Sequence, residues 1–201
     1  MPFMDSSRRE SGTIEVICGS MFSGKTEELI RRLRRAVIAR QKVQVFKPAI
    51  DRRYHETRIT SHSSHFLDAT PVPDVAALER ALLPTTQVVG IDEAQFFGMP
   101  LVECVQSMAD RGLRVVIAGL DQDYLGRPFE PVPQLLAVAE QITKCLAVCS
   151  CCGAPANRSY RLHGGGERIQ VGAAEAYEAR CRACALAGAM ALEEELRRGV
   201  A

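Results

Sequence analysis

The sequence predicts an α/β fold in which helices flank a mostly parallel sheet, with a small metal-binding lobe after it. Three observations support this prediction. Short β-rich runs alternate with helical segments as far as residue 148. A glycine-rich phosphate loop follows the first of these runs. Of the eight cysteines, six lie between Cys145 and Cys184, which suggests a metal site.

The first two elements flank the phosphate loop. Residues 13–18, TIEVIC, form a short apolar run that is typical of a buried strand. Residues 26–41 predict a helix, because Leu29, Leu33 and Val37 recur every four residues, with arginines on the other face. A strand, a glycine-rich loop and a helix therefore follow one another directly.

The alternation of strands and helices continues through the next hundred residues. We expect further strands at 42–48, 87–92, 113–120 and 142–148. We expect further helices at 72–83, 99–112 and 131–141. Asp74 is placed to cap the first of these helices and Gly112 to end the second. Residues 51–71 are polar and read as irregular, and residues 185–201 read as a terminal helix.

Composition limits the class of protein. The chain has 201 residues, a formal net charge of +1 and 47% hydrophobic residues, which suits one domain with a small appendage. It lacks an apolar run long enough for a transmembrane helix, and its N-terminus does not resemble a secretory signal. We therefore expect a cytoplasmic protein that does not bind membranes. We divide it into a disordered tail, a phosphate-loop domain, a metal-binding lobe and a C-terminal helix, at 1–11, 12–148, 149–188 and 189–201.

The stretch GSMFSGKT matches the phosphate-loop pattern G-x-x-x-x-G-K-[ST] at every fixed position. Backbone N–H groups of such a loop bind phosphate oxygens, and the helix that follows adds the positive end of its dipole. Lys25 is placed to reach the β- and γ-phosphates, and Thr26 to ligate Mg²⁺. The predicted nucleotide site comprises Gly19, Ser20, Met21, Phe22, Ser23, Gly24, Lys25 and Thr26.

Two adjacent carboxylates follow the strand at 87–92. Asp92 ends the apolar run VVGID, where a phosphate-loop protein places the aspartate that helps to hold Mg²⁺. Glu93 comes one residue later and can take a proton from an acceptor. Ala94 and Gln95 complete the stretch that we assign to the nucleotide site. These parts alone fit an ATPase, a motor or a kinase.

Two C-x-x-C pairs, Cys149/Cys152 and Cys181/Cys184, predict a structural zinc site with four thiolate ligands. Cys151 leaves an alternative, because it can replace Cys152 in a shifted arrangement. The segment between the pairs contains three consecutive glycines at 164–166 and suits a lid over a ligand, although a plain surface excursion fits equally well.

These motifs together resemble the thymidine kinases of the zinc-containing, RecA-like type. GSMFSGKT, DEAQFF, GLDQDYLGRPF and the two C-x-x-C pairs occur in that family's order, from about residue 13 to about residue 184. The resemblance implies transfer of the γ-phosphate of ATP to the 5′-hydroxyl of thymidine or deoxyuridine, with Glu93 as the base. It also implies a homotetramer, inhibition by the end product dTTP, and no nucleic-acid partner.

The resemblance further implies a nucleoside pocket lined by aromatic and apolar groups. The matching positions are Met21, Phe96, Leu120, Tyr124, Phe129, Val171, Gly172 and Tyr177. Asp51 and Arg53 match a loop near the active site, and their roles stay open. Two residues depart from the family's usual pattern: Glu130 stands where glycine is common, and Ser159 where threonine is frequent. These departures bear on substrate preference.

Two other functions stay open at this point. One is a RecA-like ATPase that acts on nucleic acid and carries a four-cysteine zinc ribbon. That function needs basic and aromatic residues spread over a binding face, whereas the aromatics here gather in DEAQFF and near GRPF. The other is a zinc module that binds nucleotide without turnover.

Overall fold

The computed structural model describes residues 11–50, 58–60, 66–162 and 176–197. Six strands of this part form one sheet in the order β5-β2-β6-β7-β1-β8, and each neighbouring pair is parallel. Their bounds are β1 Thr13–Gly19, β2 Val43–Pro48, β5 Thr70–Val72, β6 Val88–Ile91, β7 Arg114–Gly119 and β8 Gln141–Cys145. The predicted α/β fold with a parallel sheet is confirmed.

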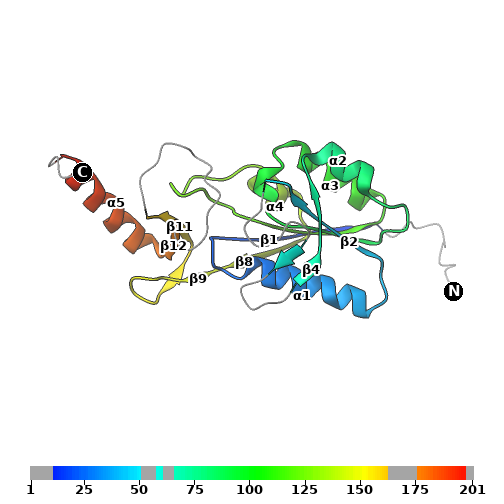
Figure 1. Ribbon diagram of the computed structural model, residues 1–201, viewed down its shortest axis with the longest axis horizontal. Helices are drawn as coiled ribbons and strands as arrows, with labels where there is room; N and C mark the ends of the chain where they lie inside the picture. The colour runs from blue at the N-terminus through cyan, green and yellow to red at the C-terminus, as the bar shows by residue number, and fades with distance from the viewer. Residues whose placement is uncertain (1–10, 51–57, 61–65, 163–175, 198–201) are drawn as a thin grey trace, which may run out of the picture.

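Helices cover both faces of this sheet (Figure 1). The helices are α1 Lys25–Ile38, α2 Val75–Ala81, α3 Pro100–Asp110 and α4 Val132–Val138, with a short 3₁₀ helix η1 at Ala94–Phe96. One face packs in a single apolar cluster with α2, α3 and α4, and the other packs against α1. Since all six strands run in parallel, their carboxyl ends lie at one edge, which is where ligands bind in such sheets.

Most of the apolar face predicted for α1 is buried. Leu29 and Leu33 are inaccessible to solvent, but Val37 is 52% exposed, so its prediction as a core residue was wrong. A four-residue step advances 400° around a helix, so each repeat turns about 40° away from the core. Ala36 takes the buried position instead. Close packing of α1 on the sheet also requires Gly90, where a Cβ would lie 2.5 Å from Leu33 Cδ1.

Two predicted segments differ from the structure. Residues 51–71 are not wholly irregular, because a hairpin of β3 Arg58–Thr60 and β4 Phe66–Asp68 lies within them and β5 begins at Thr70. The strand expected at 142–148 is two strands, because the chain leaves the sheet after Cys145 and β9 Ala147–Val148 pairs with β10 Pro155–Ala156. Short apolar runs show strand character but not the partner with which a strand pairs.

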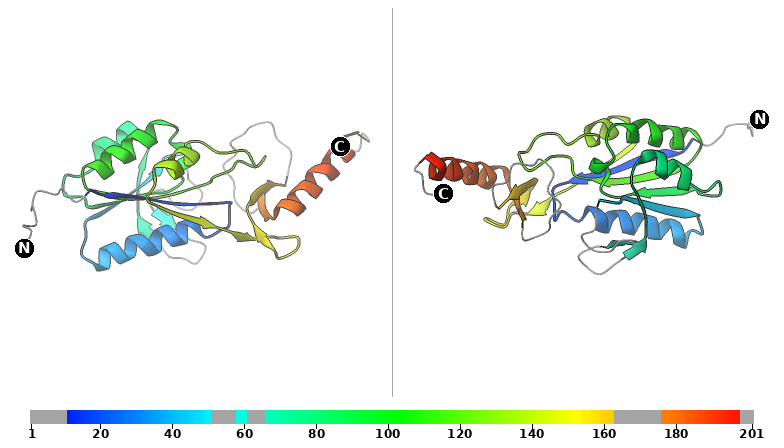
Figure 2. Two further views of the ribbon diagram at one scale, coloured as in Figure 1. Left: turned by 180° about the vertical axis from the view of Figure 1, so that it is seen from behind. Right: turned by 45° about the horizontal axis from the view of Figure 1, so that its top comes forward.

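A smaller lobe extends beyond the carboxyl edge of the sheet (Figure 2). It contains β9 and β10, a second two-stranded antiparallel sheet of β11 Arg158–Arg161 and β12 Tyr177–Arg180, and the helix α5 Arg182–Arg197. Its apolar cluster has four small buried members, Ala147, Cys149, Ala156 and Ala179, with Phe22, Cys181 and Cys184 packed against them. Such a small core cannot stabilise a lobe alone, which suggests that another interaction contributes.

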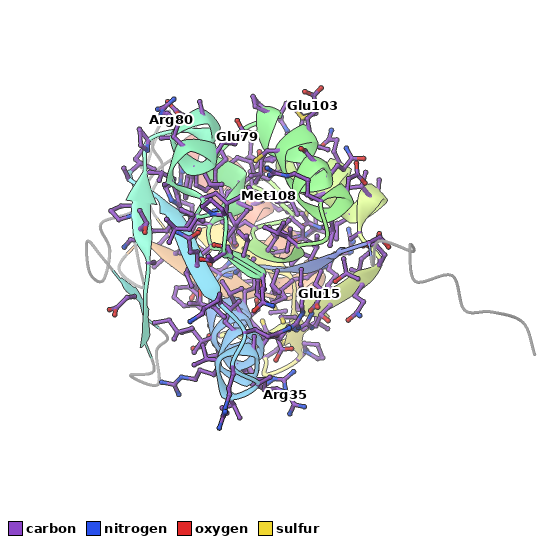
Figure 3. All side chains as sticks on the ribbon, turned by 90° about the vertical axis from the view of Figure 1, so that its right-hand side faces the viewer. Glu15, Arg35, Glu79, Arg80, Glu103 and Met108 are labelled. Carbon is purple, nitrogen blue, oxygen red and sulfur yellow. The ribbon has the colours of Figure 1, made fainter. Side chains whose placement is uncertain are left out.

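The amino-terminal edge of the sheet carries a buried ion-pair cluster. Glu15 on β1 accepts from Arg32 Nη1 on α1 at 2.7 Å and from Arg114 Nε on β7 at 2.6 Å. Figure 3 shows Glu15 between the layer of α3, which carries Met108, and α1, which carries Arg35. Burial alone would raise the pKa of Glu15, but the hydrogen bonds from Arg114 and Arg32 outweigh it and leave the pKa lowered.

The predicted cap of α2 is confirmed, since the Asp74 carboxylate accepts from the backbone N–H of Ala77 at 2.7 Å. Gly112 follows α3 with φ 93°, as expected of a residue that ends a helix. Within the described residues, none of the helices is both long enough and apolar enough to span a bilayer.

Candidate active site and metal site

The phosphate loop connects β1 to α1 at the carboxyl edge of the sheet. Gly19 has φ 146°, and a Cβ there would lie 2.2 Å from the carbonyl oxygen of Cys145. Gly24 has φ 81° and precedes the first residue of α1. Only glycine adopts either conformation without strain. At Gly19, only glycine also leaves room for the neighbouring strand β8. The fixed glycines of the motif thus shape a loop whose backbone surrounds the start of α1.

Lys25 and Thr26 open α1 and face the loop and the end of β6. Lys25 is buried, and its Nζ donates to the carbonyl oxygen of Ser20 at 2.7 Å. Thr26 Oγ1 donates to Asp92 Oδ2 at 3.2 Å. Asp92 follows the last residue of β6, is buried and also accepts from the backbone N–H of Glu93 at 3.0 Å. A hydroxyl and a carboxylate at this separation fit the oxygen ligands that Mg²⁺ prefers.

Glu93 has an unusual backbone conformation, with φ 52° and ψ 44°. For a residue with a side chain this costs about 1–2 kcal/mol, and such strain is concentrated at functional sites. The Glu93 carboxylate accepts from Gln95 Nε2. Gln95 is buried, and its Oε1 in turn accepts from the backbone N–H of Leu120 at 2.9 Å. Gln95 therefore holds the Glu93 carboxylate in a fixed relation to the end of β7.

The predicted nucleoside residues come from both lobes. Phe96 in η1 meets Phe129 edge-on, with ring centroids 6.5 Å apart. Leu120 and Tyr124 follow β7 and are partly buried, whereas Tyr177 on β12 is buried. Ala94 is fully buried in the core between the sheet and α2–α4. Four predicted positions, Asp51, Arg53, Val171 and Gly172, lie outside the described residues.

The phosphate loop also contacts the smaller lobe directly. Phe22 packs on the core of that lobe, as Cys181 and Cys184 also do. The backbone N–H of Met21 donates to Ser159 Oγ at 3.0 Å, and Ser20 Oγ lies 3.4 Å from the carbonyl oxygen of Ala156. Residues of the loop that have no fixed role in its motif therefore join it to the second lobe.

Four thiols of the smaller lobe converge. The sulfur atoms of Cys149, Cys152, Cys181 and Cys184 lie within 4.8 Å of one another. The distance from Cys152 Sγ to Cys181 Sγ is 3.7 Å. A tetrahedral zinc ion with Zn–S bonds of 2.3 Å would separate its ligands by about 3.8 Å, so the thiols fit such an ion. Cys151 is not among the four, and the arrangement agrees with the C-x-x-C spacing.

The protonation of these thiols is uneven. The pKa of Cys149 is lowered to about 6, and the largest cause is a hydrogen bond from the backbone of Cys181. The pKa of Cys184 is raised, because its thiol is hydrogen-bonded to the sulfur of Cys181. Neighbouring thiolates repel one another, whereas a divalent metal binds all four as thiolates. Outside this cluster, Cys18 and Cys104 are buried and Cys145 is half-buried.

Sequence reasoning gave no role to Arg161 and identified Ser159 only as a departure from the family's pattern. Both side chains lie on the buried face of β11, where Ser159 contacts the phosphate loop and Arg161 contacts Tyr124 and Tyr177. The available signal was the buried alternation of this four-residue strand, which is too short to recognise between two cysteine pairs.

Comparison with known proteins agrees with this geometry. The family model "Thymidine kinase" matches residues 12–185. Three proteins named thymidine kinase are similar along most of their length. The one from Bdellovibrio bacteriovorus is 60% identical over 171 residues, which cover 85% of this chain and 84% of the relative. The one from Rhodothermus sp. is 61% identical over 173 residues, which cover 86% of this chain and 81% of the relative.

The third relative, from Porphyromonas gingivalis, is 54% identical over 182 residues, which cover 90% of this chain and 87% of the relative. The family match spans both the phosphate loop and the four cysteines. This chain belongs to the thymidine kinase family.

Proposed function

We propose that the protein transfers the γ-phosphate of ATP to the 5′-hydroxyl of thymidine, or of deoxyuridine, and releases ADP and the nucleoside monophosphate. The single observation that carries the proposal is the arrangement at the carboxyl edge of the sheet. Glu93, whose backbone is strained, comes directly after Asp92 in the chain, and Asp92 is hydrogen-bonded to Thr26 of the phosphate loop. A carboxylate at this place can take a proton from water or from an acceptor hydroxyl, and the match to the thymidine kinase family favours the hydroxyl of a nucleoside.

One set of residues would bind ATP, the phosphate donor, and another would bind the nucleoside, the acceptor. The N–H groups of Gly19–Thr26 and the Nζ of Lys25 would bind the triphosphate. Lys25 already donates to a neutral carbonyl, and a phosphate oxygen is a stronger acceptor for its ammonium group. Thr26 and Asp92 would hold Mg²⁺, which neutralises charge on the β- and γ-phosphates. Ala94 and Gln95 complete the donor side, and Gln95 orients Glu93.

Glu93 would accept the proton of the 5′-hydroxyl while that oxygen bonds to the γ-phosphorus. The bond from this phosphorus to the bridging oxygen breaks, and ADP leaves with that oxygen. The acceptor pocket would be lined by Met21, Phe96, Leu120, Tyr124, Phe129 and Tyr177, with Val171 and Gly172 offering backbone groups to the base. Apolar walls exclude water, which would otherwise compete for the phosphate.

A cytoplasmic homotetramer and inhibition by dTTP are parts of the proposal that rest on the family alone. A zinc ion held by Cys149, Cys152, Cys181 and Cys184 is supported in addition by the convergence of the four sulfur atoms. We propose a phosphate-loop domain that ends with β8 at Cys145 and a zinc lobe that begins with β9 at Ala147. Helix α5, Arg182–Arg197, belongs to this lobe and begins before the C-terminal helix expected at 189–201. Zinc would have a structural role, since four thiolates leave no open position for a substrate.

The test is a panel of nucleosides with ATP and Mg²⁺, with the monophosphate products measured directly. We expect thymidine or deoxyuridine to be phosphorylated. Glu93→Gln should still bind ATP but lose about 100-fold or more in kcat, the usual contribution of a general base. Glu103→Gln, an exposed carboxylate on α3, is the matched control and should behave as wild type. Turnover that rises with single-stranded DNA and ignores nucleosides would refute the proposal.

A further inference from the structure

The sheet of β11 and β12 carries an arginine stacked on a tyrosine on each of its faces. On the buried face, the Arg161 guanidinium carbon lies 3.8 Å from the centroid of the Tyr124 ring. On the opposite face, Arg180 lies 3.6 Å from the centroid of the Tyr160 ring. Side chains alternate along a strand, which explains why Tyr160 and Arg161 diverge. The first stack faces the candidate active site and the second faces α5, where a Cβ on Gly188 would meet Arg180.

The stack on the buried face joins two segments that are far apart in the sequence. Tyr124 lies on the loop that follows β7 in the larger lobe, and Tyr177 lies on β12 in the smaller one. Arg161 is 5.4 Å from the Tyr177 ring centroid, and its Nη2 donates to the Tyr177 hydroxyl at 2.9 Å. A single buried guanidinium therefore contacts both tyrosines that we assign to the nucleoside pocket.

The loop that carries Tyr124 is internally fixed. The buried carboxylate of Asp123 accepts from the backbone N–H of Leu125 at 3.0 Å and from that of Arg127 at 2.9 Å. The backbone N–H of Asp123 donates to the carbonyl oxygen of Arg127 at 2.9 Å. Such a turn moves as a unit, so the position of Tyr124 relative to β12 depends on what holds the loop to the smaller lobe.

Arginines of β11 make that attachment. Arg158 Nη1 donates to the side-chain oxygen of Gln122, and Arg161 stacks on Tyr124. The two arginines contact different parts of the turn. Arg158 contacts Gln122, where the turn begins, whereas Arg161 contacts the ring of Tyr124, which we assign to the pocket. Of the two, only Arg161 also contacts a pocket residue of β12.

We propose that Arg161 is a positioning residue that sets the distance between Tyr124 and Tyr177, and thereby the affinity for the nucleoside. This inference rests on the proposed function. Arg161 acts through the two tyrosines and has no part in the transfer of phosphate. Its loss therefore weakens binding of the ground state and the transition state alike, which raises KM for the nucleoside and leaves kcat nearly unchanged.

The decisive comparison is Arg161→Met against Arg180→Met. Each variant removes one guanidinium from a tyrosine of the same sheet, but on opposite faces. We expect Arg161→Met to raise the nucleoside KM by about 10-fold while the ATP KM changes less than about 2-fold. Arg180→Met should leave both KM values within about 2-fold of wild type, whatever its effect on Tm.

Two milder variants probe the same contact. Arg161→Lys keeps a cation near the Tyr124 ring but loses the planar fork, so its nucleoside KM should lie between those of wild type and Arg161→Met. Tyr177→Phe removes only the hydroxyl that Arg161 contacts. It should reproduce part of the rise in KM and add little when it is combined with Arg161→Met, because residues that act as a unit are not additive.

The outcomes separate the two proposals. Wild-type protein that phosphorylates no nucleoside refutes the proposed function, and the role of Arg161 with it. Active wild-type protein whose nucleoside KM is unchanged in Arg161→Met, or raised equally in Arg180→Met, refutes the role of Arg161 alone. If Arg161→Met does not fold, Arg161→Lys and Tyr177→Phe decide, and an unchanged nucleoside KM in both overturns the inference.

Discussion

The backbone N–H of Met21 in the phosphate loop donates to the Ser159 hydroxyl of β11 at 3.0 Å. This bond crosses from the larger lobe to the smaller one, between residues that are 138 positions apart. Phe22 packs on the smaller lobe next to it. The loop that we assign to ATP and the strand that carries Arg161 are thus in direct contact, so a change in one lobe reaches both substrate sites.

Ser159→Ala tests this contact. Ser159 is buried, so the variant leaves the N–H of Met21 without its acceptor, at a cost of about 1–3 kcal/mol in the free energy of unfolding. We also expect KM to rise for the nucleoside, because Met21 is assigned to its pocket. Denaturant unfolding and steady-state kinetics measure the two effects. Ser107→Ala, at an exposed position on α3, is the control, and an equal loss of stability there would contradict the assignment.

Gly19→Ala should be among the most damaging single substitutions in the phosphate loop. A Cβ at Gly19 would lie 2.2 Å from a backbone oxygen of β8, in addition to the strain of φ 146°. Together these cost about 3 kcal/mol or more in the free energy of unfolding, and ATP binding should be lost. Gly98→Ala is the matched variant, since it has φ 69° but its new methyl group would make only an ordinary contact, 3.8 Å from Pro100 Cδ. It should lose only about 1–2 kcal/mol.

Much of the larger lobe was predictable because its signals are local. The phosphate loop, the Asp74 cap and the apolar strands each follow from a few neighbouring residues. The sheet could be predicted as parallel for the same reason, since helices separate its strands. Val37 shows the limit, because a four-residue repeat already drifts away from the helical period after about two turns.

The smaller lobe was predictable only in part. The C-x-x-C spacing indicated the four converging thiols, because each pair spans one turn. Three roles were not predictable, because each depends on a contact between the two lobes. Phe22 packs on the smaller lobe, Ser159 accepts from the phosphate loop, and Arg161 stacks on Tyr124. Contacts between distant segments leave no period or motif in the sequence. They are also the contacts that we expect to determine nucleoside affinity.

Glu15→Gln should destabilise the protein in a pH-dependent way. Removing the charge leaves Arg32 and Arg114 without their shared carboxylate, at a cost of about 3 kcal/mol near pH 7. The folded pKa of Glu15 lies below the unfolded value, so the carboxylate stabilises the fold above pH 4.5 and loses that effect as the pH falls through the folded pKa.

Urea unfolding of wild-type and Glu15→Gln protein between pH 7 and pH 3 checks this prediction. The difference in unfolding free energy should narrow on acidification, and a difference that grows instead would contradict it. Glu28→Gln provides a comparison, because hydrogen bonding to Arg31, and then to Arg32, lowers the pKa of Glu28 to about 2 although that glutamate is more exposed. Its substitution should cost about 1 kcal/mol or less.

Cys152→Ser and Cys151→Ser together test the metal site. Cys152 is one of the four thiols that lie within 4.8 Å of one another, and Cys151 is not, although the two are adjacent. We expect Cys152→Ser to lose bound zinc, as measured by elemental analysis, and Cys151→Ser to keep it at the wild-type level. The core of this lobe is too small to hold β11 and β12 without the metal. Cys152→Ser should therefore also raise the nucleoside KM, because Tyr177 and Arg161 lose their support. Loss of zinc with an unchanged KM would show that the lobe positions these residues without metal, and retention of zinc by Cys152→Ser would overturn the ligand set itself.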